Sequence, residues 1–213
     1  MGCLGLFLLL FIALPLVFFL VFFNVVTISF GKLGLSQEAA VMLLLAILIG
    51  SMINIPVSRR RLVYQQPQPF FTRFLYYLPP RVVHQVITVN VGGALIPTGF
   101  ALYLFPRAPL LPVLVATAVV ALVSRLLARP VRGIGIVMPF WVVPLLSAGL
   151  ALFLARENPS PVAYISGAMG TLIGADLLNW SSFKKLGAHL ISIGGAGVFD
   201  GIFLTGIVAA LIA

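Results

Sequence analysis

Apolar residues fill most of the chain, and short polar breaks divide them into seven long runs. Their approximate limits are residues 4–29, 37–57, 83–105, 109–128, 134–155, 160–180 and 190–212. Each run is long enough for a helix to cross a hydrocarbon layer about 30 Å thick. The breaks carry proline, glycine and charged residues, which are typical of loops. The pattern predicts an all-α bundle of seven membrane-spanning helices that forms one domain over residues 1–213.

Composition points the same way. Hydrophobic residues make up 62% of the 213 residues and charged residues 8%, and the mean hydropathy is +1.20. A soluble domain of this length has too little interior to bury so much apolar surface. The sequence therefore predicts an integral membrane protein.

Basic residues gather in alternate breaks between the runs, which predicts an orientation because cytoplasmic loops collect Lys and Arg. Ten of the thirteen basic residues lie in the second, fourth and sixth breaks or next to them: Arg59, Arg60, Arg61, Arg73, Arg81, Arg125, Arg129, Arg132, Lys184 and Lys185. Lys32, Arg107 and Arg156 lie in the other set. The N-terminus is therefore expected in the cytoplasm and the C-terminus outside it.

The net charge of +9 needs no nucleic acid to explain it. Basic residues near a membrane surface attract anionic lipid headgroups, at about 1 kcal/mol per residue. Nucleic-acid binding would require a basic patch on a recognisable fold, and these residues are dispersed over three loops. The expected partners are membrane lipids, with anionic headgroups at the basic loops, and no nucleic acid.

Two of the four acidic residues, Asp176 and Asp200, interrupt runs that are otherwise apolar. An ionised carboxylate inside a bilayer costs about 2.5 kcal/mol or more, so such residues usually face a bundle interior or a water-filled cavity and have a function there. With the orientation above, both aspartates fall in the cytoplasmic third. The same level is expected to hold further polar and glycine residues that would support substrate or ion binding: Asn54, Asn90, Asn179, Gly195 and Gly197.

Neither a metal centre nor a cofactor is expected. The two histidines, His84 and His189, lie 105 residues apart, and neither has a neighbouring glutamate that would form a His-Glu-x-x-His motif. The single Cys3 can form neither an internal disulfide nor a metal cage.

Two aspartates at one depth can share a proton, one acting as the base for water and the other as the acid. In this respect the chain resembles the intramembrane aspartyl proteases of the presenilin, signal-peptide-peptidase and prepilin-peptidase group, in which the second aspartate follows a Gly-x-Gly-Asp motif. Here Gly195-Ala-Gly197 is followed by two further residues before Asp200, and the Pro-Ala-Leu element of that group is missing after it. The resemblance implies catalytic roles for Asp176 and Asp200.

The segments Gly-Ala-Asp-Leu-Leu-Asn at 174–179 and Gly-Gly-Ala-Gly-x-Phe-Asp-Gly-Ile-Phe-Leu-Thr-Gly at 194–206 also resemble the signatures of an uncharacterised family. Its members are small prokaryotic membrane proteins with a domain of unknown function. The resemblance spans most of the chain and implies a location in the prokaryotic cytoplasmic (inner) membrane. It implies no activity.

Three functions are consistent with these patterns. The chain could be an aspartic peptidase that acts on a membrane-embedded peptide, or a proton- or cation-coupled transporter of a small solute that uses the same aspartates. In the third interpretation both aspartates are structural. The separation of the two carboxyl groups would decide whether they cooperate, and the sequence leaves this distance and the oligomeric state open.

Overall fold

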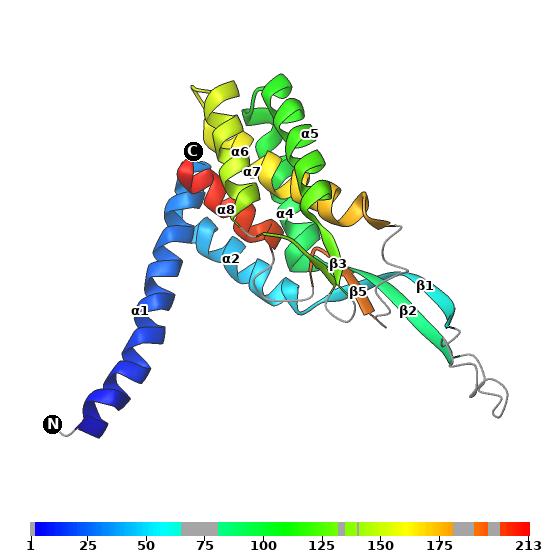
Figure 1. Cartoon of the computed structure of the whole chain (residues 1–213). Coiled ribbons are helices and arrows are strands. Elements are labelled where there is room, and N and C mark those ends of the chain that lie inside the picture. The colour runs from blue at the N-terminus through cyan, green and yellow to red at the C-terminus, as the bar shows by residue number, and fades with distance from the viewer. Residues whose placement is uncertain (1–2, 65–80, 132–134, 140, 181–189, 196–200) are drawn as a thin grey trace.

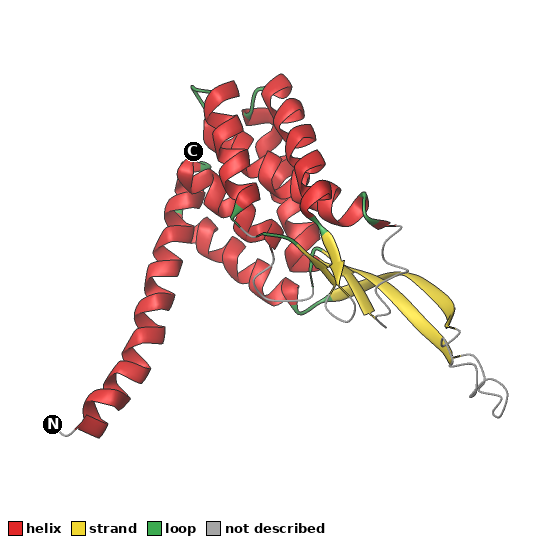
Figure 2. Ribbon diagram, viewed as in Figure 1, coloured by secondary structure: helices red, strands yellow, loops and turns green. Residues whose placement is uncertain are grey.

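A computed structural model describes residues 3–64, 81–131, 135–139, 141–180, 190–195 and 201–213 (Figure 1). Most of these residues are helical, as the sequence predicts, and a small sheet lies at one end of the helices (Figure 2). The fold is therefore a helix bundle with strands at one end.

Five helices form the body of the bundle. They are α4 (Ile96–Leu104), α5 (Leu110–Leu127), α6 (Val142–Leu154), α7 (Pro159–Thr171) and α8 (Gly201–Ile212). Helix α7 lies at the centre, packed against the other four, and eleven of its thirteen residues are buried. A helix that is buried all round forms the core of a bundle.

Glycines allow α7 and the turn that follows it to approach α5 closely. A Cβ atom on Gly170 would lie 2.6 Å from Cγ1 of Val120, and one on Gly174 would lie 2.2 Å from the carbonyl oxygen of Ala121. Small residues at helix contacts are typical of bundles in membranes, where close packing drives association. This contact fixes the C-terminal end of α7 against α5.

The first two helices, α1 (Cys3–Lys32) and α2 (Gln37–Ser51), pack beside this bundle. The N-terminal part of α1 projects away from the body (Figure 1). Its C-terminal part is fastened to α8, because the Ser29 hydroxyl donates to the carbonyl oxygen of Ile207 at 2.8 Å and Lys32 Nζ donates to that of Leu211 at 2.6 Å. A cation at a helix C-terminus is favourable because the last carbonyl groups lack helical partners.

Three strands form the sheet, in the order β1-β2-β5. Strand β1 (Asn54–Tyr64) pairs antiparallel with β2 (Arg81–Asn90), and β2 pairs parallel with β5 (Leu190–Ile193). Two short strands, β3 (Arg129–Val131) and β4 (Gly135–Val137), form a separate ribbon. A π-helical turn, η1 (Val91–Leu95), joins β2 to α4, a 3-10 turn, η2 (Phe105–Arg107), follows α4, and a second π-helical turn, η3 (Leu172–Leu177), extends α7.

The strands differ from the sequence prediction. Residues 54–57, 83–90, 135–137 and 190–193 were expected at the ends of helical spans and are extended instead. They are rich in β-branched residues, which favour a pleated strand. Two described helical stretches, Phe11–Lys32 and Leu110–Leu127, are long and apolar enough to cross a membrane. A total of seven spans and their orientation stay predictions.

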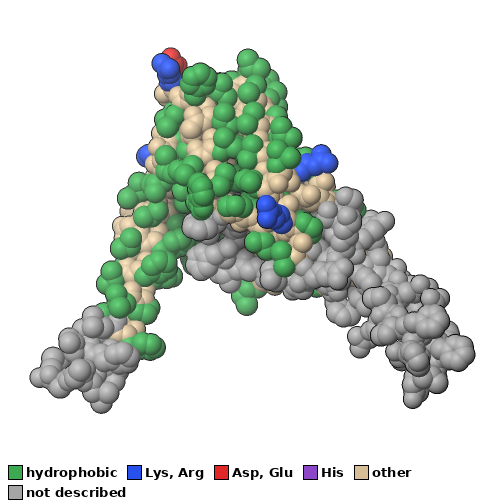
Figure 3. Space-filling model, viewed as in Figure 1, with side chains coloured by type: hydrophobic (Ala, Val, Ile, Leu, Met, Phe, Trp, Pro, Cys, Tyr) green, Lys and Arg blue, Asp and Glu red, His purple; other side chains and the backbone are tan. Residues whose placement is uncertain are grey.

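The outer faces of the helices carry large apolar side chains, and the interior carries small ones. On α5, Leu111 and Leu126 are 72% and 73% exposed, whereas Ala116 and Ser124 are fully buried. On α6, Phe153 is 73% exposed and Ser147 is fully buried. The visible face of the helical body is correspondingly hydrophobic (Figure 3). This distribution is the reverse of that in a soluble bundle, where polar residues cover the surface.

Candidate functional site

Asp176 lies in η3, at the point where the polypeptide of α7 approaches the sheet. Its side chain is partly buried, and its Oδ2 atom accepts a hydrogen bond of 2.8 Å from the backbone N–H of Gly194. π-Helical turns inside helices often occur at functional sites because they redirect one side chain. The contact joins the sixth predicted span to the seventh.

Gly194 and Gly195 form a turn directly after β5. Their φ angles are +81° and +77°, a backbone conformation that favours glycine. Space also requires glycine at the first position, because a Cβ atom on Gly194 would lie 2.6 Å from Cβ and 2.7 Å from the backbone nitrogen of Ala94. The turn is therefore held between η1 on one side and Asp176 on the other.

Asn90 organises η1 from within the protein. Its side chain is fully buried; Oδ1 accepts from the backbone N–H of Gly93 at 2.6 Å, and Nδ2 donates to the carbonyl oxygen of Ser51 at 2.7 Å. An asparagine in this role caps the start of a helical turn and satisfies donors that would otherwise be unpaired. Asn90 thus joins β2, η1 and the end of α2.

Asn54 lies beside Asn90, its register partner across β1 and β2. Its Oδ1 atom accepts from Asn90 Nδ2 at 3.3 Å and from the Ser192 hydroxyl at 2.7 Å, and the Thr88 hydroxyl lies 3.5 Å away. One amide oxygen therefore gathers side chains from all three strands of the sheet. Its hydrogen-bonding capacity is already used.

The structure brings together four of the seven residues singled out in the sequence: Gly195 is part of the turn, and Asn54, Asn90 and Asp176 lie around it. Asn179 is directed elsewhere, since its Nδ2 atom donates to the carbonyl oxygens of Gly174 and Ala175, both at 3.1 Å, on its own helix. Asp200 and Gly197 lie outside the described residues. The separation of the two carboxyl groups, which the sequence leaves open, therefore also lies outside the described residues.

Ser192 and Thr88 were missed in the sequence. Both lie on strands, where alternate residues share one face, and they occupy paired positions on β5 and β2. The signal that could have found them is the strand character of these segments. In paired strands Thr88, Asn90 and Ser192 fall on one face at the end of the bundle.

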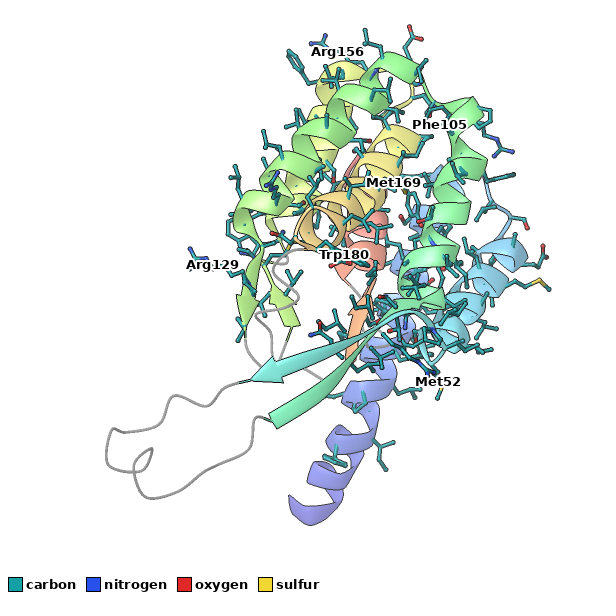
Figure 4. All side chains as sticks on the ribbon, turned by 90° about the vertical axis from the view of Figure 1, so that its right-hand side faces the viewer. Met52, Phe105, Arg129, Arg156, Met169 and Trp180 are labelled. Carbon is teal, nitrogen blue, oxygen red and sulfur yellow. The ribbon has the colours of Figure 1, made fainter. Side chains whose placement is uncertain are left out.

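The described residues contain no group of three or more His, Cys, Asp or Glu side chains that could hold a metal ion. Basic residues lie at both ends of the bundle. Arg129 lies toward the sheet, and Arg156 lies at the far end of the bundle (Figure 4). Among the described acidic residues, Glu38 lies in the first turn of α2 and Glu157 lies before α7, whereas Asp176 bonds to the residue that follows β5.

Comparison with known proteins identifies the family. The family described as "Protein of unknown function (DUF1614)" matches residues 48–212, which include every segment of the site. The chain belongs to this family. No curated protein and no solved structure matches the chain. Membership confirms the resemblance to an uncharacterised family, and none of the comparisons supports the resemblance to intramembrane aspartyl proteases.

Proposed function

We propose that this DUF1614 protein is an integral membrane peptidase in which Asp176 and Asp200 hydrolyse a peptide bond at the sheet end of the bundle. The membrane location is supported by the exposed apolar side chains and the small buried ones. Helix α5, with 18 residues, is about 27 Å long, close to the ~30 Å thickness of a hydrocarbon core.

The topology can be tested separately. The C-terminus lies at the end of the bundle away from the sheet (Figure 1). With the charge bias of the loops, a reporter fused after Ala213 is expected on the extracytoplasmic side, and one inserted near Gln66 is expected in the cytoplasm. Alkaline phosphatase and green fluorescent protein fusions measure the two sides. Both reporters on the same side would contradict this topology.

The observation that carries the peptidase proposal is the position of strand β5. Among the described residues β5 pairs only with β2, so its other edge has no strand partner. The residue that follows β5, Gly194, donates to Asp176. An extended peptide can add to such an edge through main-chain hydrogen bonds, and it would then lie beside the carboxylate. The same segment continues to Asp200 six residues later.

The extended conformation of the bound peptide matters for hydrolysis of its peptide bond. In a helix each backbone carbonyl group is hydrogen-bonded and shielded, whereas a strand exposes the carbonyl carbon to attack. One carboxylate would take a proton from a water molecule while the oxygen of that water bonds to the carbonyl carbon. The other carboxyl group would protonate the carbonyl oxygen. The tetrahedral adduct then breaks its C–N bond: the first carboxyl group gives the proton it took from water to the leaving nitrogen, and the second carboxylate takes back the proton from the hydroxyl group as the C=O bond re-forms. Two carboxyl groups therefore suffice without a metal.

Ion-coupled transport is the second candidate, and the interrupted segments favour it. Strand β2 changes to π-helix and then to α4 at Asn90, and β5 ends at the Gly194 turn. Discontinuous segments of this kind hold ions in transporters. The amide oxygens of Asn54 and Asn90, however, already accept hydrogen bonds within the protein. This use of the two oxygens makes the peptidase the better-supported candidate.

Reconstitution of the full chain into phosphatidylethanolamine–phosphatidylglycerol vesicles tests the two candidates together. The probe is a single-span peptide with an extended cytoplasmic end, and mass spectrometry detects its products. Internal pH- and Na⁺-sensitive dyes report ion movement. We expect cleavage and no dissipation of imposed gradients. Ion movement without cleavage would overturn the peptidase proposal in favour of transport. The absence of both signals would overturn both candidates and favour the structural interpretation.

A further inference from the structure

The geometry of the turn at Gly194 and Gly195 decides whether Asp176 keeps its hydrogen bond. The Gly194 N–H is the only described donor to this carboxylate. The direction of this N–H bond depends on the positive φ angles of Gly194 and Gly195. Glycine has more backbone freedom than any other residue, so these angles can change easily. The close approach of η1 confines Gly194, and a further contact at Gly195 would fix the other half of the turn.

The Ser192 hydroxyl is suited to this role. Its Oγ atom lies 2.5 Å from the carbonyl oxygen of Gly195 and 2.7 Å from Asn54 Oδ1. A hydroxyl group has one proton to donate, so these two acceptors share it. The Gly195 carbonyl group is in this way connected to the sheet.

The sheet side of this connection is held by further hydrogen bonds. Asn54 accepts from Asn90, which is fully buried and bonded to Ser51 at the end of α2. Thr88 donates to the carbonyl oxygen of Ile191 at 3.3 Å, which adds a cross-strand contact next to Ser192. Side chains that are locked by a second set of hydrogen bonds can hold a functional group in one orientation.

We infer that Ser192 and Asn54 are positioning residues that fix the Gly194–Gly195 turn and thereby aim the Gly194 N–H at Asp176. The expected effect of this role on cleavage rests on the proposed function, whereas its effect on the conformation of the turn does not. It assigns Asn54 to the support of the turn and not to binding a substrate or an ion. Without the Ser192 hydroxyl the Gly195 carbonyl group loses its donor, the turn rotates more freely, and the carboxylate loses its fixed orientation.

The test compares Ser192→Ala with Ser192→Thr in the full chain in vesicles. Threonine keeps the hydroxyl and suits a strand. The control is Ser147→Ala, because Ser147 is fully buried, whereas Ser192 is partly buried, and among the described residues the Ser147 hydroxyl bonds only to Val143 and Pro144 of its own helix. Two quantities are measured: hydrogen exchange of the peptide that covers residues 190–195, and kcat and KM for the single-span peptide probe.

We expect Ser192→Ala to speed exchange in residues 190–195 about tenfold without affecting α5, and to lower kcat about tenfold with KM unchanged, as expected when only orientation is lost. Ser192→Thr and Ser147→Ala should match the wild type. Asn54→Ala should behave like Ser192→Ala, and the double variant should be no worse, since the two act as one unit.

Unchanged exchange in residues 190–195 of Ser192→Ala would overturn the inference, as would equal acceleration in α5. The exchange measurement does not depend on catalysis. Local acceleration in a protein whose wild type cleaves nothing would therefore support the positioning role and overturn the peptidase proposal.

Discussion

Asp176→Asn is expected to lower peptide cleavage by at least about 100-fold, because general acid–base catalysis by a positioned group contributes roughly 10²–10⁴ in rate. Asparagine has the same shape as aspartate, and its side-chain oxygen can still accept the Gly194 N–H, so the fold should be retained. Initial rates in vesicles measure the loss, and circular dichroism on heating checks the fold. Glu157→Gln, an exposed change at the opposite end of the bundle, serves as the control.

The partner change, Asp200→Asn, should have the same effect, and the double variant should be no slower than either single variant. Residues that act as one catalytic unit give such non-additive losses. Two losses that multiply would contradict a shared-proton pair. Full activity and stability in both single variants would favour the structural interpretation of the aspartates.

Gly92→Ala is expected to destabilise the fold by about 3 kcal/mol or more, at or beyond the upper end for overpacking of a core. A Cβ atom at this position would lie 2.1 Å from the carbonyl oxygen of Ile47 and 2.3 Å from the backbone nitrogen of Ser51. Both are backbone atoms and cannot rotate away. Thermal unfolding in detergent, followed by circular dichroism, measures the effect.

Gly99→Ala provides the control for this experiment. Gly99 lies in α4, a few residues from Gly92, but a Cβ atom there would meet nothing within 4 Å. Alanine in an open helical position stabilises by up to about 1 kcal/mol relative to glycine. Equal stability of Gly92→Ala and Gly99→Ala would show that α2 and η1 are not packed as described.

The helical character of the chain could be predicted from hydropathy, but the sheet could not. A hydropathy window detects apolar residues and does not distinguish a helix from a strand when both are buried. The run Val82-Val83-His84-Gln85-Val86-Ile87-Thr88-Val89 is rich in β-branched residues, and it forms most of β2. The prediction followed its hydrophobicity and extended the third span through it.

The candidate site could be predicted in part for a similar reason. Asn54, Asn90 and Asp176 stand out because each is polar within an apolar run, and the structure does place them around one turn. Asn179 also stands out, yet it bonds to its own helix, as short polar side chains often do. Ser192 reaches the site because β5 pairs with β2, and the sequence around Ser192 does not indicate which distant strand it will pair with.

The parallel pairing of β2 with β5 has a consequence for the order in which the protein is made. The Thr88 hydroxyl and the Ile191 carbonyl group that it contacts are 103 residues apart. During synthesis Asn54 and Asn90 emerge long before Ser192 and Gly194, and closing so long a loop is slow. The edge of β2 that receives β5 therefore stays unpaired until the C-terminal half of the chain has been made. The Gly194 N–H that Asp176 accepts belongs to this later part of the chain, so under the proposed function a chain that ends before β5 is expected to lack peptidase activity.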